Sequence, residues 1–282
     1  EVCDSNSLFG LSTFEGLFPQ AIPIHCVLGD SHAALFAQGC TRPGLGKATY
    51  GTGSSVMINV GKTPVESDAL VTSLAWGMDG RVDYVLEGNI NYTGAVINWL
   101  RDDIGLLEDP AQVGNIAQSV PDNGGVYLVP AFSGLGAPYW ESRAQGLFCG
   151  LSRKTQKAHL VRAAEECIAY QITDIVRQVQ KAGVPLQELR ADGGPTRDAF
   201  LMQFQADQLG FPLCASHIPE LSGAGAAFGA GLACGLYTPE LLAAGRAATQ
   251  YQPEHPQQAA QWYAGWQRAV RAALAFARDS EI

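Results

Sequence analysis

Runs of apolar residues in the first half of the chain are short and rich in β-branched residues, which predicts strands. These runs are Ile22–Leu28, Ala48–Thr52, Ser55–Val60, Val71–Trp76 and Val82–Glu87. Gly53 separates the second run from the third, and Met78-Asp79-Gly80 separates the fourth from the fifth. Because glycine and Asp-Gly steps mark tight turns, we expect two antiparallel hairpins.

In the second half of the chain, segments with the apolar spacing of a helix alternate with short apolar runs typical of strands. Apolar residues at helical spacing predict helices over Thr93–Asp103, Lys157–Ala182, Thr196–Leu209, Ser222–Leu236 and Pro256–Arg278. Short apolar runs predict strands over Val126–Pro130, Leu186–Ala191 and Phe211–Cys214. Antiparallel strands followed by this alternation imply an α/β domain, with a mixed sheet and helices on both of its faces. We expect this domain to span residues 21–282, and residues 1–20 to form an arm from a missing N-terminal domain.

Composition narrows the class of protein. The 282 residues are 47% hydrophobic and 16% charged, which is enough for a large core. The formal net charge of −9, without a basic patch, argues against nucleic acid and anionic membranes as partners. Seven cysteines occur singly, without a CxxC pair, and no apolar stretch reaches 18 residues. Reduced thiols and the lack of a spanning segment predict a soluble, cytoplasmic protein.

Three glycine turns follow predicted strands, where ligands of open α/β sheets bind. In Gly29-Asp30-Ser31, the carboxylate can accept a proton from a bound hydroxyl or face a metal ion, or it can cap the following helix. In Gly51-Thr52-Gly53, amides and a hydroxyl can reach phosphate oxygens, or the turn is an ordinary hairpin. In Asp192-Gly193-Gly194, the backbone can lie against a flat ligand, or the glycines form one of the many ordinary turns of this kind. The pattern alone leaves each pair of readings open.

Other motifs that bind cofactors are missing from the sequence. There is no GxxxxGK[ST], no GxGxxG between a strand and a helix, and no GxSxG. The five histidines lie far apart without ligand spacing, so no metal site held by side chains is predicted.

Six segments, taken in order, resemble the FGGY family of carbohydrate kinases. They are GDSHAALFAQG, KATYGTGSSVMINVG, YVLEGNINYTGAVINWLRD, VYLVPAFSGLGAPYW, GLFCGLSRKTQKAHLVRAAEE and DGGPTRDAFLMQFQADQLG. The resemblance covers about Ile22 to Tyr237 and is strongest to glycerol kinases and xylulokinase-like members. It implies the actin-like ATPase (ribonuclease H-like) fold, of which this chain is the C-terminal, nucleotide-binding domain.

The resemblance implies a role for each turn. Asp30 matches the general base that takes the proton from the substrate hydroxyl, and with Ser31 it lies beside the substrate. The positions matching the nucleotide site are Gly51, Thr52, Gly53, Gly94, Asn98, Gly193, Gly194 and Asp198. Of these, Thr52 matches the residue that holds the transferring phosphates, and Gly193 and Gly194 match the turn beside the adenine.

The sequence departs from the family pattern at four positions. Ser31 replaces a substrate-contacting glutamine of glycerol kinases, and Asp198 replaces an asparagine. Pro195 is also a departure, and Glu165 lies where the family has an apolar residue. We interpret Glu165 as variation on a helix surface.

The resemblance implies ATP-dependent phosphorylation of a sugar or polyol hydroxyl, with ATP and Mg²⁺ as cofactors. A ketose such as xylulose is slightly favoured over glycerol. The first phosphate loop, of the DxGT type, and its domain are absent from the sequence, so this chain alone is expected to be inactive. Two other classes stay open: an actin-like nucleotide-binding scaffold, and a sugar-binding module using Tyr139 and Trp140. The oligomeric state is open too, a homodimer included.

Overall fold

The structure is a computed structural model that describes residues 2–238 and 247–278. Within these residues the main sheet has seven strands in the order β11-β10-β9-β3-β4-β6-β5. The strands are β3 (Leu45–Tyr50), β4 (Ser54–Gly61), β5 (Val71–Met78), β6 (Arg81–Ile90), β9 (Glu188–Asp192), β10 (Leu213–Ser216) and β11 (Ala248–Tyr251). β9 is parallel to both β3 and β10, and all other pairs are antiparallel. The predicted mixed sheet is confirmed.

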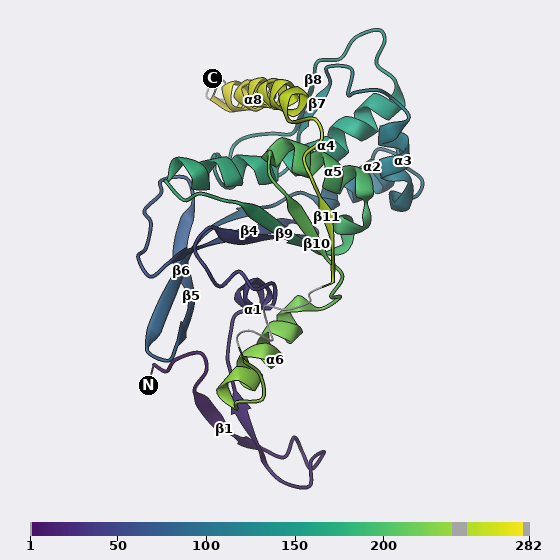
Figure 1. Ribbon diagram of the computed structural model, residues 1–282. Helices are drawn as coiled ribbons and strands as arrows, with labels where there is room; N and C mark the ends of the chain where they lie inside the picture. The colour runs from purple at the N-terminus through teal and green to yellow at the C-terminus, as the bar shows by residue number, and fades with distance from the viewer. Residues whose placement is uncertain (1, 239–246, 279–282) are drawn as a thin grey trace.

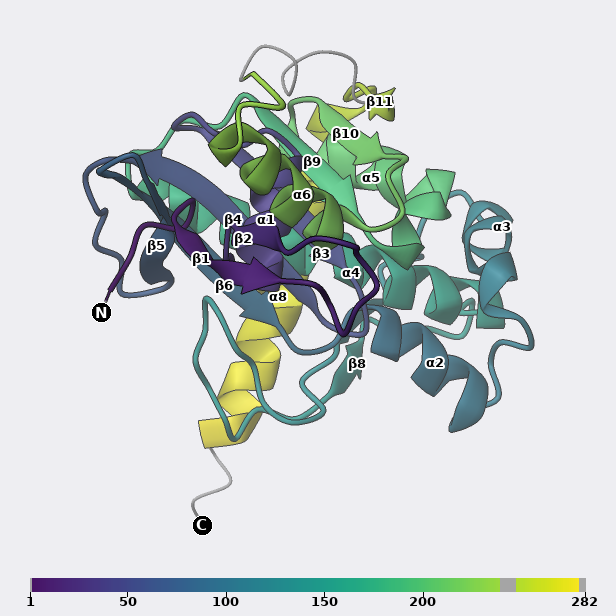
Figure 2. The ribbon, with the colours of Figure 1, turned by 90° about the horizontal axis from the view of Figure 1, so that it is seen from below.

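Helices cover both faces of this sheet (Figures 1 and 2). On one face, α4 (Lys157–Lys181) packs on β4 and β6, and α5 (Ala199–Leu209) packs beside it on β10. On the other face, α1 (Asp30–Ala37) inserts Leu35 and Phe36 against Met57, and α6 (Leu221–Ala233) packs on α1. The two hydrophobic layers hold the turns at the ends of β3 and β9 in fixed positions.

The C-terminal helix α8 (Pro256–Arg278) does not pack on the main sheet, which differs from our prediction that the helices lie on the two faces of the sheet. It forms a further layer outside α4 and α5 and contacts β7 (Tyr127–Val129) (Figure 1). Trp266 is fully buried and stacks on Tyr170 of α4, with ring centroids 5.3 Å apart. The expectation is wrong because α4 is itself buried nearly all round, so its outer face offers α8 an apolar partner.

Several short elements have too little pattern to be predicted. They are β1 (Leu8–Ser12), β8 (Leu147–Cys149), α3 (Val113–Gln118) and β11. β1 pairs with β2 (Ile22–His25), so the segment that we predicted as an arm holds one strand of a hairpin. The helix α2 (Gly94–Asp102) follows β6, as predicted. None of the helices in the described ranges is both long and apolar enough to cross a bilayer.

Candidate functional site

A cavity of about 510 Å³ opens where the hairpin tip between β3 and β4, the start of α2 and the turn after β9 meet. Six of the eight positions predicted for a nucleotide line it, namely Gly51, Thr52, Gly94, Asn98, Gly194 and Asp198. These residues come from three separate parts of the sequence. The fold therefore brings together most of the positions that the sequence singled out, and a nucleoside with its phosphates is of a suitable size for this space.

The hairpin tip is held by the N-terminus of α2. The Gly51 carbonyl accepts hydrogen bonds from the Gly94 amide at 2.9 Å and from Thr93 Oγ1 at 3.0 Å. A side chain at Gly94 would place its Cβ 2.6 Å from the Gly51 oxygen, and one at Gly53 would lie 2.4 Å from the Ile90 oxygen. The glycines thus allow the two backbones to approach closely. The Thr52 side chain is left exposed at the cavity.

Gly193 and Gly194 have different structural roles. Gly193 has a φ of 97°, and a Cβ there would lie 1.9 Å from the Tyr50 carbonyl oxygen. This residue fits only as glycine and does not itself line the cavity. Gly194 lines the cavity, and a Cβ there would meet no atom within 4 Å. Gly193 shapes the turn, and Gly194 presents its backbone to the cavity.

Asp198 both caps a helix and lines the cavity, whereas the sequence analysis assigned it only to the nucleotide site. Its Oδ1 accepts hydrogen bonds from the amides of Phe200 at 2.8 Å and Leu201 at 3.2 Å, which caps the N-terminus of α5. Its carboxylate also lines the cavity and lies against Gly114 of α3, where a Cβ would come within 2.3 Å of Oδ2. The aspartate therefore fixes the corner between α3 and α5 and places a negative charge there.

Asp30 and Ser31 do not line the cavity. Gly29 is the N-cap of α1, and Asp30 is the first helical residue, exposed, with Oδ1 accepting from the Ser31 amide at 2.6 Å. Burial lowers the pKa of Lys47 on β3, and the charges of Asp192 and Asp30 are among the influences that oppose this. Asp30 thus lies within electrostatic reach of the strand that leads to the hairpin tip.

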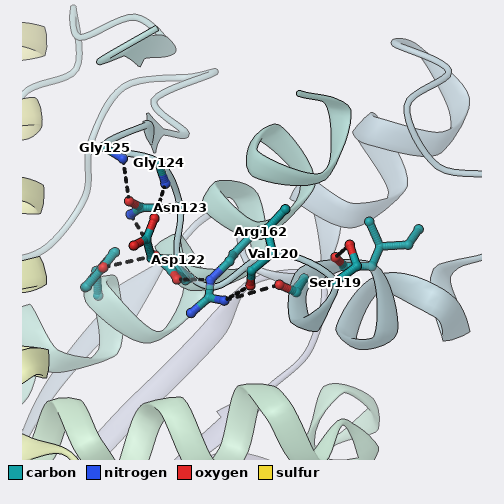
Figure 3. A network of polar contacts seen from close by, with 11 residues as sticks. Ser119, Val120, Asp122, Asn123, Gly124, Gly125 and Arg162 are labelled. Carbon is teal, nitrogen blue, oxygen red and sulfur yellow. Dashed lines mark hydrogen bonds and ion pairs between the residues drawn. The ribbon is translucent and has the colours of Figure 1, made fainter. Parts of the chain in front are cut away.

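Two neighbouring glutamates on α4 differ in their contacts, although each is only 1% exposed. Glu166 accepts hydrogen bonds from Arg162 Nε at 2.7 Å, Asn123 Nδ2 at 2.9 Å and the Tyr170 hydroxyl at 3.1 Å. Figure 3 shows Arg162 reaching at the same time to the loop at residues 119–125, where Nη1 donates to the Val120 carbonyl at 2.7 Å. This network fixes the register of α4 against that loop.

Glu165 lines the cavity, and neither of its carboxylate oxygens has a hydrogen-bond partner among the described residues. Our interpretation of Glu165 as variation on a helix surface is wrong, because α5 and α3 cover that side of α4. Sequence reasoning also missed Arg197, an exposed cation at the cavity. The sequence did contain a sign of this role, because Glu165 is charged at a position where the family has an apolar residue.

Residues 46–234 match the FGGY family of carbohydrate kinases, C-terminal domain. This match covers more than half of the chain, and the chain belongs to that family. It is 46% identical over 284 residues to a glycerol kinase of Stenotrophomonas maltophilia, covering 99% of this chain and 57% of that protein. It is 47% identical over 275 residues to a glycerol kinase of Carboxydothermus hydrogenoformans, covering 96% of this chain and 55% of that protein. The chain thus spans little more than half the length of the curated relatives that it matches.

Two solved structures are similar to the fold. The structure of Plasmodium falciparum glycerol kinase with ADP matches with a TM-score of 0.88 and 32% sequence identity. The match covers 96% of this chain and 55% of the kinase chain. A ligand-bound xylulose kinase of Lactobacillus acidophilus has a TM-score of 0.86 at 21% identity, and covers 98% of this chain and 57% of that one, which supports the fold alone. The predicted actin-like kinase fold is confirmed.

Proposed function

We propose that this chain is the nucleotide-binding part of an enzyme that transfers the terminal phosphoryl group of ATP to a hydroxyl of a polyol or sugar. The observation that carries the proposal is the cavity, which joins Thr52, Gly94 and Gly194 from separate parts of a chain that belongs to a kinase family. Phosphoryl transfer depends mainly on positioning and on stabilisation of charge, which backbone amides and hydroxyls at such turns can supply.

The cavity lining contains groups that suit both parts of a nucleotide. At the hairpin tip, the exposed Thr52 hydroxyl and the amides beside it suit phosphate oxygens. Ile97, Val113 and Leu201 add apolar lining that suits a flat base. Asp30, at the start of α1, would take the proton of the acceptor hydroxyl as the new bond to phosphorus forms.

The side chains of the described residues suit Mg²⁺ only when the nucleotide phosphates supply most of its ligands. In the described part of the chain, no three His, Cys, Asp or Glu side chains cluster closely enough to hold a metal ion. Mg²⁺ commonly binds through one or two protein oxygens together with substrate phosphates, and it neutralises their charge. The Thr52 hydroxyl, which lines the cavity, is an oxygen donor that would lie close to these phosphates.

We favour glycerol as the acceptor. The preference for a ketose that we drew from the sequence is not supported, because the curated relatives named above are glycerol kinases. Ser31 still differs from the glutamine of glycerol kinases, so the acceptor needs a direct assay. A screen of the full-length enzyme, meaning this chain joined to the predicted N-terminal domain, should give the highest kcat/KM with glycerol. A higher value with xylulose would overturn this choice.

The proposed role of Asp30 can be tested in the full-length enzyme. Asp30→Asn should lower kcat by about 10²–10⁴-fold, because the general base is lost, and should leave the Kd for ATP nearly unchanged. Asp68→Asn removes another exposed carboxylate and should leave kcat unchanged. If Asp30→Asn kept a normal kcat, the carboxylate would serve only the start of α1.

The chain alone should consume no ATP in response to glycerol, because closure over the substrate needs a second domain. Measurable turnover by this chain alone would contradict its proposed place as one part of a larger enzyme.

A further inference from the structure

Glu165 is a buried carboxyl group that faces the cavity without a partner. It is 1% exposed, it lines the cavity, and both of its oxygens lack a hydrogen bond within the residues that the structure describes. Leaving a buried polar group unpaired destabilises a fold, so such groups call for an explanation. The adjacent Glu166 shows that the same helix can satisfy a buried carboxylate fully with three donors. The orphaned oxygens of Glu165 therefore indicate a partner that binds in the cavity.

The charges around Glu165 decide its protonation state. Burial, and then the nearby Asp198 carboxylate, hold the pKa of Glu165 well above its ordinary value of 4.5. Glu166 acts in the same direction, and Arg162 acts against it but is engaged by Glu166. The Asp198 carboxylate is thus close enough to favour the protonated form of Glu165, and its Oδ1 caps α5. A neutral carboxyl group offers one donor and one acceptor, side by side.

The position of Glu165 suits a base rather than a phosphate. The hairpin tip docks beside Thr93, and the preceding Tyr92 carbonyl accepts a hydrogen bond from Gln171 Nε2 on α4 at 3.0 Å. Glu165 lies six residues earlier on α4, which is about 9 Å along the helix. The cavity lining around it includes Val113 and Leu201, which are apolar. Asp198, which is close to Glu165, contacts both Gly114 and Leu201, so Glu165 lies beside the apolar lining that suits a base.

We propose that the Glu165 carboxyl group recognises the adenine base, accepting a hydrogen bond from its exocyclic amino group and donating one to the adjacent ring nitrogen. The proposal rests on the proposed function, because it assumes an adenine nucleotide in the cavity. Adenine presents this donor and acceptor side by side, so one neutral carboxyl group satisfies both. A site built to pair polar groups in this way rejects ligands that lack them.

Two substitutions separate recognition from packing. Glu165→Gln keeps one donor and one acceptor, whereas Glu165→Leu keeps a similar volume without either. Calorimetric titration of this chain with MgADP should give similar Kd values for the wild type and Glu165→Gln. Glu165→Leu should bind at least about tenfold more weakly, the loss expected for two hydrogen bonds. In etheno-ADP the exocyclic amino group is blocked. The wild type should bind etheno-ADP more weakly than ADP, whereas Glu165→Leu should bind the two nucleotides with similar Kd values.

The pH dependence gives a readout that a structural role would not produce. As the pH rises through the raised pKa of Glu165, the carboxyl group loses its proton and can no longer donate to the ring nitrogen. The Kd of the wild type for MgADP should therefore increase relative to that of Glu165→Gln, which does not titrate. The comparison cancels the titration of the nucleotide itself. Equal pH profiles would overturn the proposal.

The folding of the variants is checked by their melting temperatures. Glu165→Leu removes an unpaired buried carboxyl group, so without ligand it should melt at the same temperature as the wild type or higher. With MgADP its melting temperature should rise less than that of the wild type. Unchanged MgADP affinity in Glu165→Leu would overturn the inference while leaving the proposed function standing. A wild type that bound no adenine nucleotide, even as the full-length enzyme, would instead refute the proposed function.

Discussion

The side-chain amide of Gln38, the C-cap of α1, donates a hydrogen bond of 2.6 Å to Asp192 Oδ2 at the end of β9, and both residues are buried. Gln38 ends the helix that begins with Asp30, and Asp192 immediately precedes the Gly193-Gly194 turn. The bond therefore joins the helix of the proposed base to the turn that lines the cavity. Movement of one should displace the other.

Gln38→Leu should test this connection. The change leaves the Asp192 carboxylate without one of its partners, which should lower the free energy of unfolding by about 1–3 kcal/mol. Gln118→Leu, an exposed change on α3, is the matched control and should have little effect. Urea unfolding of the three proteins gives the comparison. Equal stability of the two variants would mean that the hydrogen bond contributes nothing measurable.

Gly194→Val and Gly193→Val should fail in different ways. At Gly194 the added side chain meets no protein atom within 4 Å, so folding should survive while the side chain occupies space that the nucleotide needs. The Kd for ATP of the full-length enzyme should rise, with little change in melting temperature. At Gly193 the φ of 97° and the 1.9 Å approach to the Tyr50 oxygen should lower the melting temperature markedly. Unchanged ATP affinity in Gly194→Val would place the base elsewhere.

The parts of the fold that follow from local pattern were predictable from the sequence. The helix α4 begins at Lys157 as predicted, because its apolar residues keep one period over seven turns. The hairpin tip at Gly51–Gly53 carries glycines that allow a close approach of backbones, and the turn at Gly193 has a φ that only glycine adopts easily. β11 and α3 were missed, because four to six residues carry no readable period.

The site was predictable only where a single turn supplies it. Thr52 and Gly194 lie in such turns, and both line the cavity. Val113 and Glu165 line it because α3 and α5 pack against α4, and no local pattern encodes that contact. The position of α8 has the same cause. Its apolar stripe predicted a buried face but did not identify α4 and α5 as the helices against which that face packs. Tertiary contacts between helices decide both cases.

Gly225→Ala and Gly223→Ala each add one methyl group to α6. Gly225 faces α1, whereas Gly223 lies in the first turn of α6. A Cβ at Gly225 would lie 1.9 Å from the Ala33 carbonyl oxygen of α1, so the two helices would have to separate. We expect a loss of about 1–3 kcal/mol in the free energy of unfolding, as for overpacking in a core. At Gly223 the nearest atom is Glu220 Cγ at 3.4 Å, so alanine there should be neutral or slightly stabilising. Similar urea midpoints for both variants would show that α6 can shift freely on α1.

Asp174 joins three elements through its carboxylate. Its Oδ2 accepts hydrogen bonds from the Tyr139 hydroxyl at 2.9 Å and from Trp266 Nε1 at 2.8 Å, and its Oδ1 accepts from the Tyr263 hydroxyl. Tyr139 belongs to the loop after β7, and Trp266 and Tyr263 belong to α8. Burial raises the pKa of Asp174 to about 6, although the three donors partly oppose the shift.

This raised pKa predicts how stability depends on pH. Because the folded-state pKa lies above the ordinary value of 3.8, the unfolded chain ionises first as the pH rises, and the free energy of unfolding falls. A shift of about two units corresponds to about 3 kcal/mol, lost between pH 3.8 and about pH 6. Asp174→Asn does not titrate, so the stability of the wild type relative to this variant should decline by that amount over this range. Urea unfolding at several pH values measures it, with the exposed Asp103→Asn as a control whose difference from the wild type should stay nearly constant. A constant difference for Asp174→Asn as well would mean that its carboxylate titrates alike in the folded and unfolded chain, so that the three donors fully offset its burial.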